Sequence, residues 1–296
     1  MKHAGGSNII FKKIAIIGLG LMGASLGLAL KKGGIAGEVA GFARKAGTRK
    51  KALSKKIVDA VYDRIEPAVA GADLVVVCAP VGAIPAIIKK CNPALPRNAA
   101  LTDVGSAKSG IAISAGKIFA GERTRFVGSH PIAGSERHGL EAARPDLYRG
   151  AVVAVTPVKR TSRAALQKVV KFWRSLGSSV IIVSPQEHDR IIARTSHLPH
   201  LIAALLSACV GRERTPEYGR FCGPGFRDAT RIAEGDPRLW RDILADTAPL
   251  LAQELKFFSG ELRKIIATLH KGNPRAIEKY LNKGRNSRRK LLATRR

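Results

Sequence analysis

Apolar, β-branched runs alternate with helical patterns along the first half of the chain. Residues 12–17 (Lys-Lys-Ile-Ala-Ile-Ile) predict a buried strand, and residues 21–32, closed by Gly33 and Gly34, predict the helix that follows it. The same alternation predicts strands over 38–43, 74–79, 99–104, 125–128, 151–156 and 179–183, and helices over 44–56, 83–90 and 163–176. Such alternation is typical of a doubly wound α/β sheet of the Rossmann type.

After residue 183 the strand pattern ends. Ser184 and Glu187 form the ends of a capping box with Pro185 at the first helical position, which predicts a long apolar helix through about Val210. Further helices are predicted over 227–233, 237–246, 249–269 and 274–281, two of them preceded by the N-caps Asp236 and Asn273. We therefore predict a Rossmann domain over 8–183, an all-helical substrate and dimerisation domain over 184–282, and a basic tail over 283–296 that frays into solvent. Leu- and Ile-rich helices commonly bury a face against a second copy, so a homodimer is expected.

The composition predicts a folded protein but does not identify its ligand. The chain has 296 residues, 45% of them hydrophobic, so it can bury a full core. Its 51 Lys and Arg against 22 Asp and Glu give a net charge of +29. Such a charge suits an anionic substrate or cofactor, a nucleic-acid or membrane partner, or a basic surface of no specific meaning.

Cysteine usage and hydropathy favour a soluble, cytoplasmic protein. The four cysteines lie far apart without a Cys-x-x-Cys pair, so neither a disulfide framework nor a zinc site is predicted, and no metal is expected. The uncharged run 14–30 resembles a signal segment or a short membrane span, but its four glycines would weaken a spanning helix.

A glycine motif gives that run a better explanation. Residues 18–23 (Gly-Leu-Gly-Leu-Met-Gly) form a G-x-G-x-x-G between the first strand and its helix. In a dinucleotide site Gly18 allows the tight turn, Gly20 lets the backbone approach a pyrophosphate, and Gly23 permits close contact between helix and strand. Leu21 and Met22 would supply amides at the positive end of the helix dipole. The alternative is a glycine-rich turn that only packs.

The residues after the second strand bear on the choice of dinucleotide. An NAD enzyme commonly places an acidic residue about twenty residues beyond the motif, where this chain has Ala43. Arg44 follows it, and a guanidinium at this position is a usual partner of a 2′-phosphate. We therefore favour NADP over NAD. The alternative is that the seven bases of 44–56 form a solvated helix face.

Two polar clusters follow later strands, where a doubly wound sheet binds its ligands. They are 102–108 (Thr-Asp-Val-Gly-Ser-Ala-Lys) and 128–136 (Gly-Ser-His-Pro-Ile-Ala-Gly-Ser-Glu). His130 in the second cluster is suited to act as a base, because an imidazole accepts a proton near neutral pH. A serine close to it can fix the imidazole tautomer. The alternative is a structural histidine in a tight loop.

Three more stretches complete a pattern that resembles a known family. They are 196–200 (Ser-His-Leu-Pro-His), 226–233 (Phe-Arg-Asp-Ala-Thr-Arg-Ile-Ala) and 236–240 (Asp-Pro-Arg-Leu-Trp). With the glycine motif and the two polar clusters, in this order and spacing, the chain closely resembles the prephenate/arogenate (cyclohexadienyl) dehydrogenase family of tyrosine biosynthesis. The resemblance runs from about residue 14 to 269.

The resemblance implies an oxidoreductase that decarboxylates prephenate to 4-hydroxyphenylpyruvate, or arogenate to tyrosine, while reducing NAD(P). It implies that His130 accepts the proton of the substrate hydroxyl and that Ser106 orients His130 or contacts that hydroxyl. Arg231 matches the arginine that clamps a substrate carboxylate. His200, on the same helical face as His197, matches a pocket histidine. The remaining expected pocket and cofactor positions are Ser135, Trp240 and Gly225 for substrate, and Ala79 and Pro80 for the dinucleotide.

The same sequence bears on feedback regulation and on other possible functions. The chain leaves no room for the regulatory or chorismate mutase domains of some relatives, so feedback by tyrosine would act at the active site. A β-hydroxyacid dehydrogenase or imine reductase would need a lysine in the helix over 187–210, and there is none. A nucleic-acid-binding protein is disfavoured, because aromatic residues make up 5% and no recognition motif is present.

Overall fold

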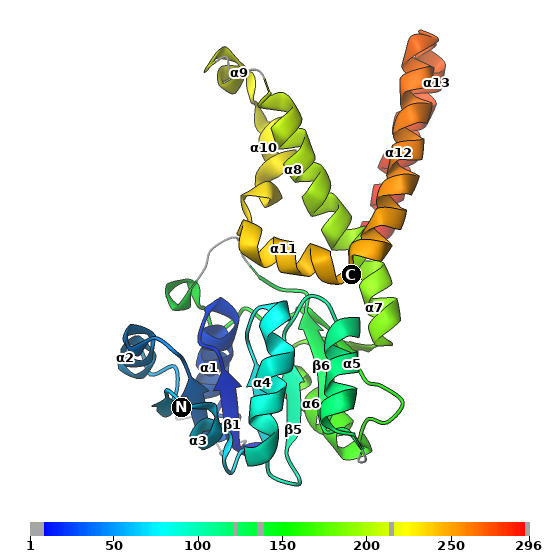
Figure 1. Cartoon of the computed structure of the whole chain (residues 1–296). Helices are drawn as coiled ribbons and strands as arrows, with labels where there is room; N and C mark the ends of the chain where they lie inside the picture. Colours follow the sequence, from blue (N-terminus) through cyan, green and yellow to red (C-terminus); the bar gives the residue numbers. More distant parts are fainter. Residues whose placement is uncertain (1–8, 121–122, 135–138, 213–215, 294–296) are drawn as a thin grey trace, which may run out of the picture. The chain divides into compact units, whose positions relative to one another are not determined.

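An eight-stranded sheet forms the centre of the first half of the chain (Figure 1). The computed structural model describes residues 9–120, 123–134, 139–212 and 216–293. The strands are β1 (Phe11–Ile17), β2 (Ala36–Phe42), β3 (Ala60–Tyr62), β4 (Leu74–Val77), β5 (Ala100–Asp103), β6 (Phe126–Pro131), β7 (Val152–Thr156) and β8 (Ser179–Ile182). Their order is β3-β2-β1-β4-β5-β6-β7-β8. The predicted Rossmann-type α/β fold is thus confirmed.

Two strands, β7 and β8, run opposite to the other six. The strands from β3 to β6 are parallel to their neighbours, whereas β7 runs antiparallel to β6, with His130 opposite Ala154. Because β1, β4, β5 and β6 are parallel, their carboxyl ends meet at one edge of the sheet. β1 and β4 are neighbours although two strands separate them in sequence. This is the topological switch point at which such sheets bind ligands.

Helices cover both faces of the sheet, and each face has its own apolar core. Buried residues of α1 (Leu21–Gly33) and α6 (Arg163–Ser175) join one cluster. Those of α3 (Ile65–Val69), α4 (Ile84–Cys91) and α5 (Ser109–Ile118) join the other. The predicted glycine stop of α1 is confirmed, because Gly34 adopts a left-handed φ of 58° and its N–H returns to Leu30 and Lys31 carbonyls. The sequence prediction missed β3, α3 and α5.

The helical segment begins at the predicted capping box. Ser184 Oγ accepts a hydrogen bond of 3.1 Å from the N–H of Glu187 at the start of α7 (Pro185–Ile192). The predicted single long helix is instead interrupted by a π-helical turn, η4 (Ala193–His197), before α8 (Leu198–Val210). Such turns are often found at functional sites.

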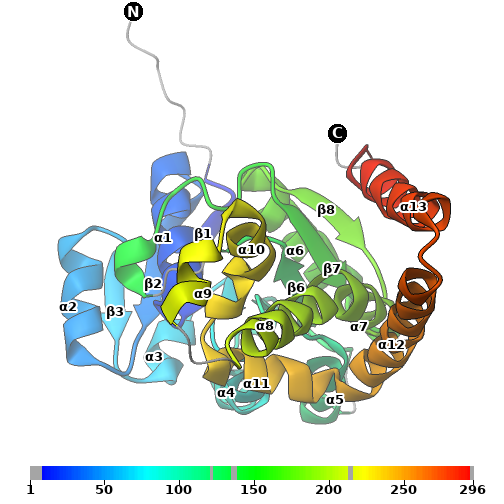
Figure 2. The same cartoon turned by 90° about the horizontal axis from the view of Figure 1, so that it is seen from above.

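Shorter helices fold back onto α8 and onto the sheet edge (Figure 2). They are α9 (Pro216–Phe221), α10 (Pro224–Thr230), η5 (Arg231–Glu234) and α11 (Pro237–Asp246). α10 and η5 pack on α8, whereas α11 packs on η1 (Val81–Ala83), the turn that follows β4. Asp236 caps α11 as predicted, accepting from the N–H of Arg238 at 2.9 Å. α11 therefore lies over the turn at the carboxyl end of β4.

Residues from Ala248 form a second compact unit of two helices, α12 (Ala248–His270) and α13 (Pro274–Ala293). Asn273 caps α13 as predicted, accepting from the N–H of Ala276 at 3.2 Å. The expected fraying of 283–296 is wrong over 283–293, because α13 continues through the basic segment to Ala293. Within the described part of the chain, no helix is long and apolar enough to cross a membrane.

Candidate active site

The glycine motif forms the turn from β1 into α1. Gly18 has a φ of 108°, and a Cβ there would lie 2.2 Å from the carbonyl oxygen of Cys78. A Cβ on Gly23 would lie 1.9 Å from the carbonyl oxygen of Gly18. A Cβ on Gly20, in contrast, would meet nothing within 4 Å. Gly18 and Gly23 are thus required by packing, whereas Gly20 keeps open a space beside the helix terminus.

That space has the features of a phosphate cradle. α1 begins at Leu21 without a side-chain cap on its amides, and no acidic residue lies in its first turn. Uncapped amides and the positive end of the helix dipole favour an anion. Met22 is held from behind, because its carbonyl accepts from the Tyr148 hydroxyl at 2.8 Å. Ala79 and Pro80 follow β4, the strand beside β1. The residues present fit a dinucleotide.

Arg44 lies just beyond the end of β2, next to the strand that carries the glycine turn. Its side chain is exposed, whereas Ala43 is buried. The guanidinium of Arg49 donates to the carbonyl oxygens of Ala43 at 2.9 Å and Arg44 at 2.8 Å. Arg49 therefore orders the backbone on which Arg44 stands.

The sequence suggested that His130 lies in a loop, but the structure places it in β6. It lies next to the carboxyl end of that strand and is half-buried. Burial first, and then the charges of His188, Lys108 and His197, lower the pKa of His130 well below its usual value, while Asp189 acts in the opposite direction. A lowered pKa keeps the imidazole neutral at physiological pH, as a base requires.

A buried ion pair fixes the strand position of His130. Lys108 and Asp103 are 1% and 0% exposed and pair with each other. Asp103 accepts from the N–H of Ser129 at 3.1 Å, and Lys108 Nζ donates to the Ser129 carbonyl at 3.0 Å. The backbone immediately before His130 is therefore held from both sides. Burial lowers the pKa of Lys108, although the Asp103 charge opposes this shift.

A second histidine contacts His130 through its ring. His130 Nδ1 lies 2.9 Å from His188 Nε2, and His188 Nδ1 lies 2.8 Å from Asp189 Oδ1. His188 and Asp189 are each 2% exposed. The sequence analysis missed both residues. Two polar residues at the start of an apolar helix, in a chain with few acids, were the available signal.

His197, His200 and Trp240 form an aromatic group above this site. The rings of His200 and Trp240 stack with centroids 3.5 Å apart, and His197 meets Trp240 edge-on at 6.0 Å. His197 Nδ1 lies 2.9 Å from Thr247 Oγ1, which itself donates to the Ile243 carbonyl. Thr247 Oγ1 therefore accepts from His197 Nδ1, and Nε2 carries the lone pair of the neutral ring. Among the described residues, His197 Nε2 and His200 Nδ1 are buried without a hydrogen-bond partner.

The other expected residues are placed less closely. Arg231 is the first residue of η5, which packs on α8 and leads to Gly235 beside His200 and Trp240. Gly225 is an exposed residue of α10. Ser106 is partly exposed in the turn between β5 and α5, and its contact with His130 or a substrate hydroxyl stays a prediction. Ser135 lies outside the described residues.

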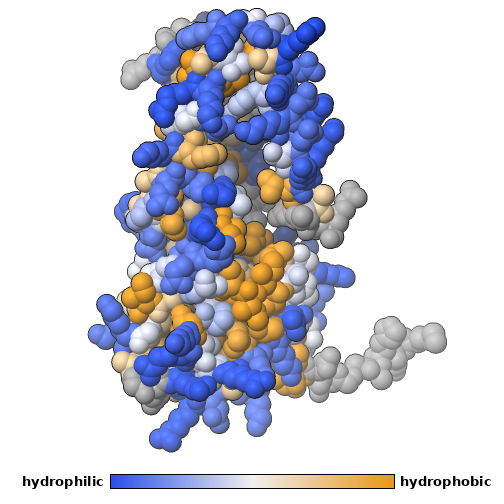
Figure 3. Space-filling model, turned by 90° about the vertical axis from the view of Figure 1, so that its right-hand side faces the viewer, coloured by the Kyte–Doolittle hydropathy of each residue, from blue (hydrophilic) through white to orange (hydrophobic). Residues whose placement is uncertain are grey.

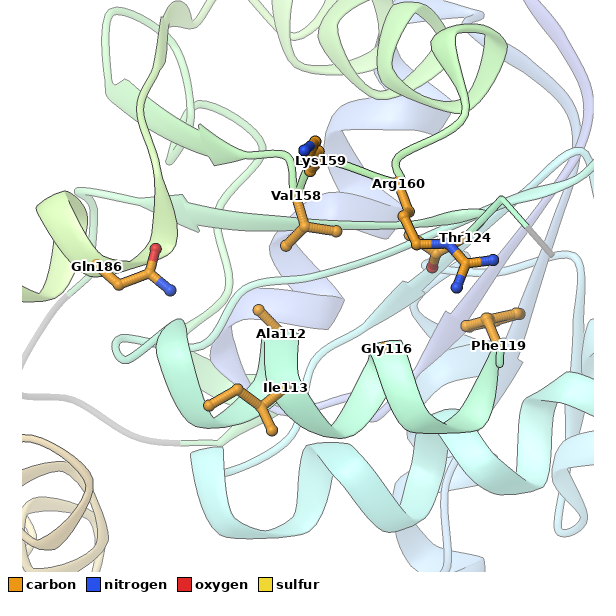
Figure 4. A pocket seen from close by; sticks show the side chains of 9 residues that line it. All are labelled: Ala112, Ile113, Gly116, Phe119, Thr124, Val158, Lys159, Arg160 and Gln186. Carbon is orange, nitrogen blue, oxygen red and sulfur yellow. The ribbon is translucent and has the colours of Figure 1, made fainter. Parts of the chain in front are cut away.

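A separate pocket of about 260 Å³ opens beside α5 (Figure 4). Its walls include Ala112 and Ile113 of α5, Arg160 before α6 and Gln186 of α7. None of the residues discussed above lines it. Among the described residues, no group of three or more His, Cys, Asp or Glu could hold a metal ion.

Comparison with known proteins gives a consistent result across the chain. Residues 26–182 match the family "Prephenate dehydrogenase, nucleotide-binding domain", and residues 184–283 match "Prephenate dehydrogenase, dimerization domain". The cyclohexadienyl dehydrogenase of Zymomonas mobilis subsp. mobilis is 36% identical over 262 residues, covering 86% of this chain and 88% of that protein. The prephenate dehydrogenase of Lactococcus lactis subsp. cremoris is 31% identical, covering 95% of this chain and 77% of that protein.

Solved structures agree. The prephenate dehydrogenase from A. aeolicus in complex with hydroxyphenyl propionate and NAD+ has a TM-score of 0.87 at 31% identity, covering 95% of this chain and 98% of that chain. Synechocystis arogenate dehydrogenase has a TM-score of 0.80 at 28% identity, covering 94% and 99%. The expected family and enzyme class are thereby confirmed: the chain belongs to the prephenate dehydrogenase family.

Proposed function

We propose that this chain catalyses the NAD(P)-dependent oxidative decarboxylation of prephenate to 4-hydroxyphenylpyruvate, or of arogenate to tyrosine. The observation that carries the proposal is the position of His130. A histidine with a lowered pKa lies one residue before the end of β6, at the same sheet edge as the glycine turn after β1. A base beside a dinucleotide is what oxidation of a ring hydroxyl requires, and the family relatives are named for this reaction.

His130 accepts the hydroxyl proton of the substrate in this proposal. A bound nicotinamide would supply the hydride acceptor for the ring carbon that bears this hydroxyl. The ring carboxylate then leaves as CO₂, and the aromatic ring that forms supplies the driving force. Gly18, Gly20 and the amides at the start of α1 would hold the pyrophosphate of that cofactor. The strand end holds His130 through the Asp103–Lys108 pair, so the base does not need to move.

The aromatic group above the site supplies substrate contacts. His197 Nε2 is a buried acceptor that a substrate hydroxyl can satisfy, and His200 Nδ1 is a second nitrogen for a polar group. Arg231 would clamp a side-chain carboxylate from η5, as a guanidinium fork does. Ser106, Ser135, Trp240 and Gly225 complete the proposed pocket.

The test is an assay of cofactor reduction with prephenate and arogenate, each with NAD and with NADP. Reduction in at least one of the four combinations is expected, with release of CO₂. If all four fail, the proposed reaction is wrong. Arg231→Gln should raise the KM for the substrate with little change in kcat, whereas Arg238→Gln, on the exposed first turn of α11, should change neither.

The preferred cofactor is proposed to be NADP. The support is the exposed Arg44 beside a buried alanine at the position of the usual acidic residue. The A. aeolicus relative was solved with NAD+, so NAD is the alternative. Arg44→Asp should shift the ratio of kcat/KM from NADP toward NAD by more than tenfold, whereas Lys50→Asp, at an exposed position of the next helix, α2 (Ala46–Ser54), should leave it unchanged. An unchanged ratio in Arg44→Asp would contradict the preference.

We further propose that the chain acts as a homodimer in the cytoplasm. The match to a dimerization domain supports this, as do Phe257, Ile266 and Leu269 of α12, which are 70%, 49% and 54% exposed. Apolar surface also gathers on the side of the sheet where β8 forms the edge (Figure 3), and Ile181 and Ile182 are exposed there. Light scattering after gel filtration should give twice the chain mass, and a monomer at micromolar concentration would contradict the proposal.

A further inference from the structure

Two hydrogen bonds connect the proposed base, His130, through His188 to the carboxylate of Asp189. We call these three residues the series. The nitrogens of the two rings are 2.9 Å apart, and His188 Nδ1 is 2.8 Å from Asp189 Oδ1. His130 comes from β6 and the other two residues from α7, so the contact crosses between the sheet and the helical segment. The rings meet edge-on, with centroids 5.1 Å apart. This arrangement constrains which atoms carry hydrogen.

Asp189 is an acceptor in this series. Its carboxylate also accepts from the backbone N–H groups of Lys108 and Ser109, both at 2.8 Å, and so caps the start of α5. Burial alone would raise the pKa of Asp189, but the hydrogen bonds from His188, Ser109 and Lys108 lower it below the usual value. An ionised carboxylate can only accept. His188 Nδ1 therefore carries a hydrogen and donates it to Asp189.

The remaining hydrogens follow. In a His188 ring whose single hydrogen is on Nδ1, Nε2 is an acceptor, and we assign the donor role in the contact between the rings to His130 Nδ1. His130 Nε2 then carries the lone pair. This nitrogen makes no contact with His188 and is the one that can accept a proton. Without His188 the two tautomers of His130 would compete, and in one of them Nε2 would carry a hydrogen and could not accept a proton.

We propose that His188 and Asp189 are positioning residues: His188, held by Asp189, sets the tautomer of His130, and the Asp189 charge stabilises the protonated form of His130. This rests on the proposed function, in which His130 is the base. When the substrate O–H bond breaks and an N–H bond forms at His130 Nε2, the hydrogen on Nδ1 remains in the bond to His188. The new positive charge is then one ring away from the Asp189 carboxylate, and no proton leaves the series.

The charged groups around His130 come from three elements. Lys108 lies in the turn before α5, His188 and Asp189 in α7, and His197 in η4. Of these, Asp189 is the group that raises the pKa of His130, whereas Lys108, His188 and His197 lower it. Removing the Asp189 charge should therefore move the acidic limb of the pH profile of kcat/KM to lower pH. A purely structural role for Asp189 would reduce activity without moving that limb.

Two substitutions of His188 separate tautomer control from packing. In His188→Gln the amide can still accept from His130 and donate to Asp189, whereas His188→Leu can do neither. We expect His188→Leu to lose about a hundredfold or more in kcat, with the KM for the cofactor unchanged, and His188→Gln to recover most of that loss. His270→Gln, an exposed residue of α12, is the matched control and should retain full activity. Equal activity in all variants would overturn the proposal.

Nitrogen-15 NMR of labelled histidines tests the tautomer without substrate, so it stands apart from the proposed reaction. At neutral pH the His130 signals, assigned by their loss in His130→Asn, should show hydrogen on Nδ1 and none on Nε2. His188→Gln should preserve this state and His188→Leu should abolish it. Hydrogen on Nε2 in the unmodified protein would overturn the proposal, even if the enzyme is active. Failure of prephenate and arogenate turnover with the expected NMR state would instead contradict the proposed function alone. If Asp189→Asn, which breaks the cap of α5, does not fold, the two His188 variants still decide.

Discussion

The turn after β1 and the end of β6 lie at the same edge of the sheet, but different groups form them. The turn consists of backbone and open space: residues 18–23 carry no titratable side chain, and Gly20 faces nothing within 4 Å. The end of β6 is enclosed by buried side chains that can carry charge, including Asp103, Lys108 and His188. One region can bind an anion with its amides alone. The other must hold a neutral base among charges.

Because of this difference, substitutions in the two regions should have different effects. Substitution in the turn should change binding of the cofactor or the local packing, and it should leave the chemistry of bound substrate intact. Substitution around β6 should change proton transfer or folding stability. Kinetics, cofactor titration and unfolding of single variants can show whether the effects separate in this way.

The largest expected effect is that of His130→Asn. Removal of a general base typically costs about 10²- to 10⁴-fold in rate, and we expect kcat to fall by that amount. Steady-state kinetics measures it, and cofactor affinity by fluorescence titration should remain as in the unmodified enzyme, because the glycine turn is unchanged. Turnover within twofold of the unmodified enzyme would exclude His130 as the base.

Next is the buried ion pair behind His130. Lys108→Met leaves the Asp103 carboxylate buried without its partner, and breaking a buried pair typically costs about 3–5 kcal/mol. Urea unfolding should show that loss in the free energy of unfolding. Lys31→Met breaks the pair with Asp59, whose side chains are 39% and 37% exposed, and should cost less than about 1 kcal/mol. Similar losses in both variants would mean that burial does not set the value of the Asp103–Lys108 pair.

In the turn, Gly20→Val is expected to affect cofactor binding and nothing else. A Cβ at this position meets no protein atom within 4 Å, and the valine methyl groups would occupy the space that a pyrophosphate would need. The Kd for the dinucleotide should rise roughly tenfold or more, equivalent to about 1.4 kcal/mol, while the melting temperature stays the same. Gly116→Val in α5, where a Cβ is equally unobstructed, is the matched control and should leave the Kd unchanged. Unchanged affinity in Gly20→Val would contradict the cradle.

The same contrast explains what could be predicted from sequence. The glycine turn is a local feature whose spacing, strand and helix lie within about 25 residues, and the structure matches it closely. The capping box at Ser184 and the cap at Asp236 are equally local, and both are present. Short, local patterns carry their own structural cause, because the backbone geometry and the residue type are linked within one turn.

The end of β6 could not be predicted in the same way. His130 and His188 are 58 residues apart, and Asp189 and Lys108 are 81 apart, so no local pattern links them. The antiparallel pairing of β7 was also missed, since a run such as 152–156 has the same apolar pattern in either direction. His130 was a candidate base from its polar cluster after a predicted strand, and the family resemblance strengthened that assignment. Its position in a strand, and the partner of its ring, required the tertiary structure.

The smallest expected effect is the pH dependence of stability that His197 contributes. The glycine turn has no titratable side chain and cannot contribute such a dependence. Burial lowers the pKa of His197 from 6.5 to about 4. Between these values the unfolded chain binds a proton and the folded chain does not, so the contribution of His197 to folding falls as the pH drops from 6.5 toward 4. For one group the slope is at most about 1.4 kcal/mol per pH unit. His197→Asn, which keeps a donor for Thr247, should remove this slope from urea unfolding measured between pH 6 and 5. Thr247→Val should lower stability at every pH and leave the slope in place, because His197 is still present to titrate. If the slope of His197→Asn equals that of the unmodified protein, His197 is not the buried neutral histidine that its contacts indicate.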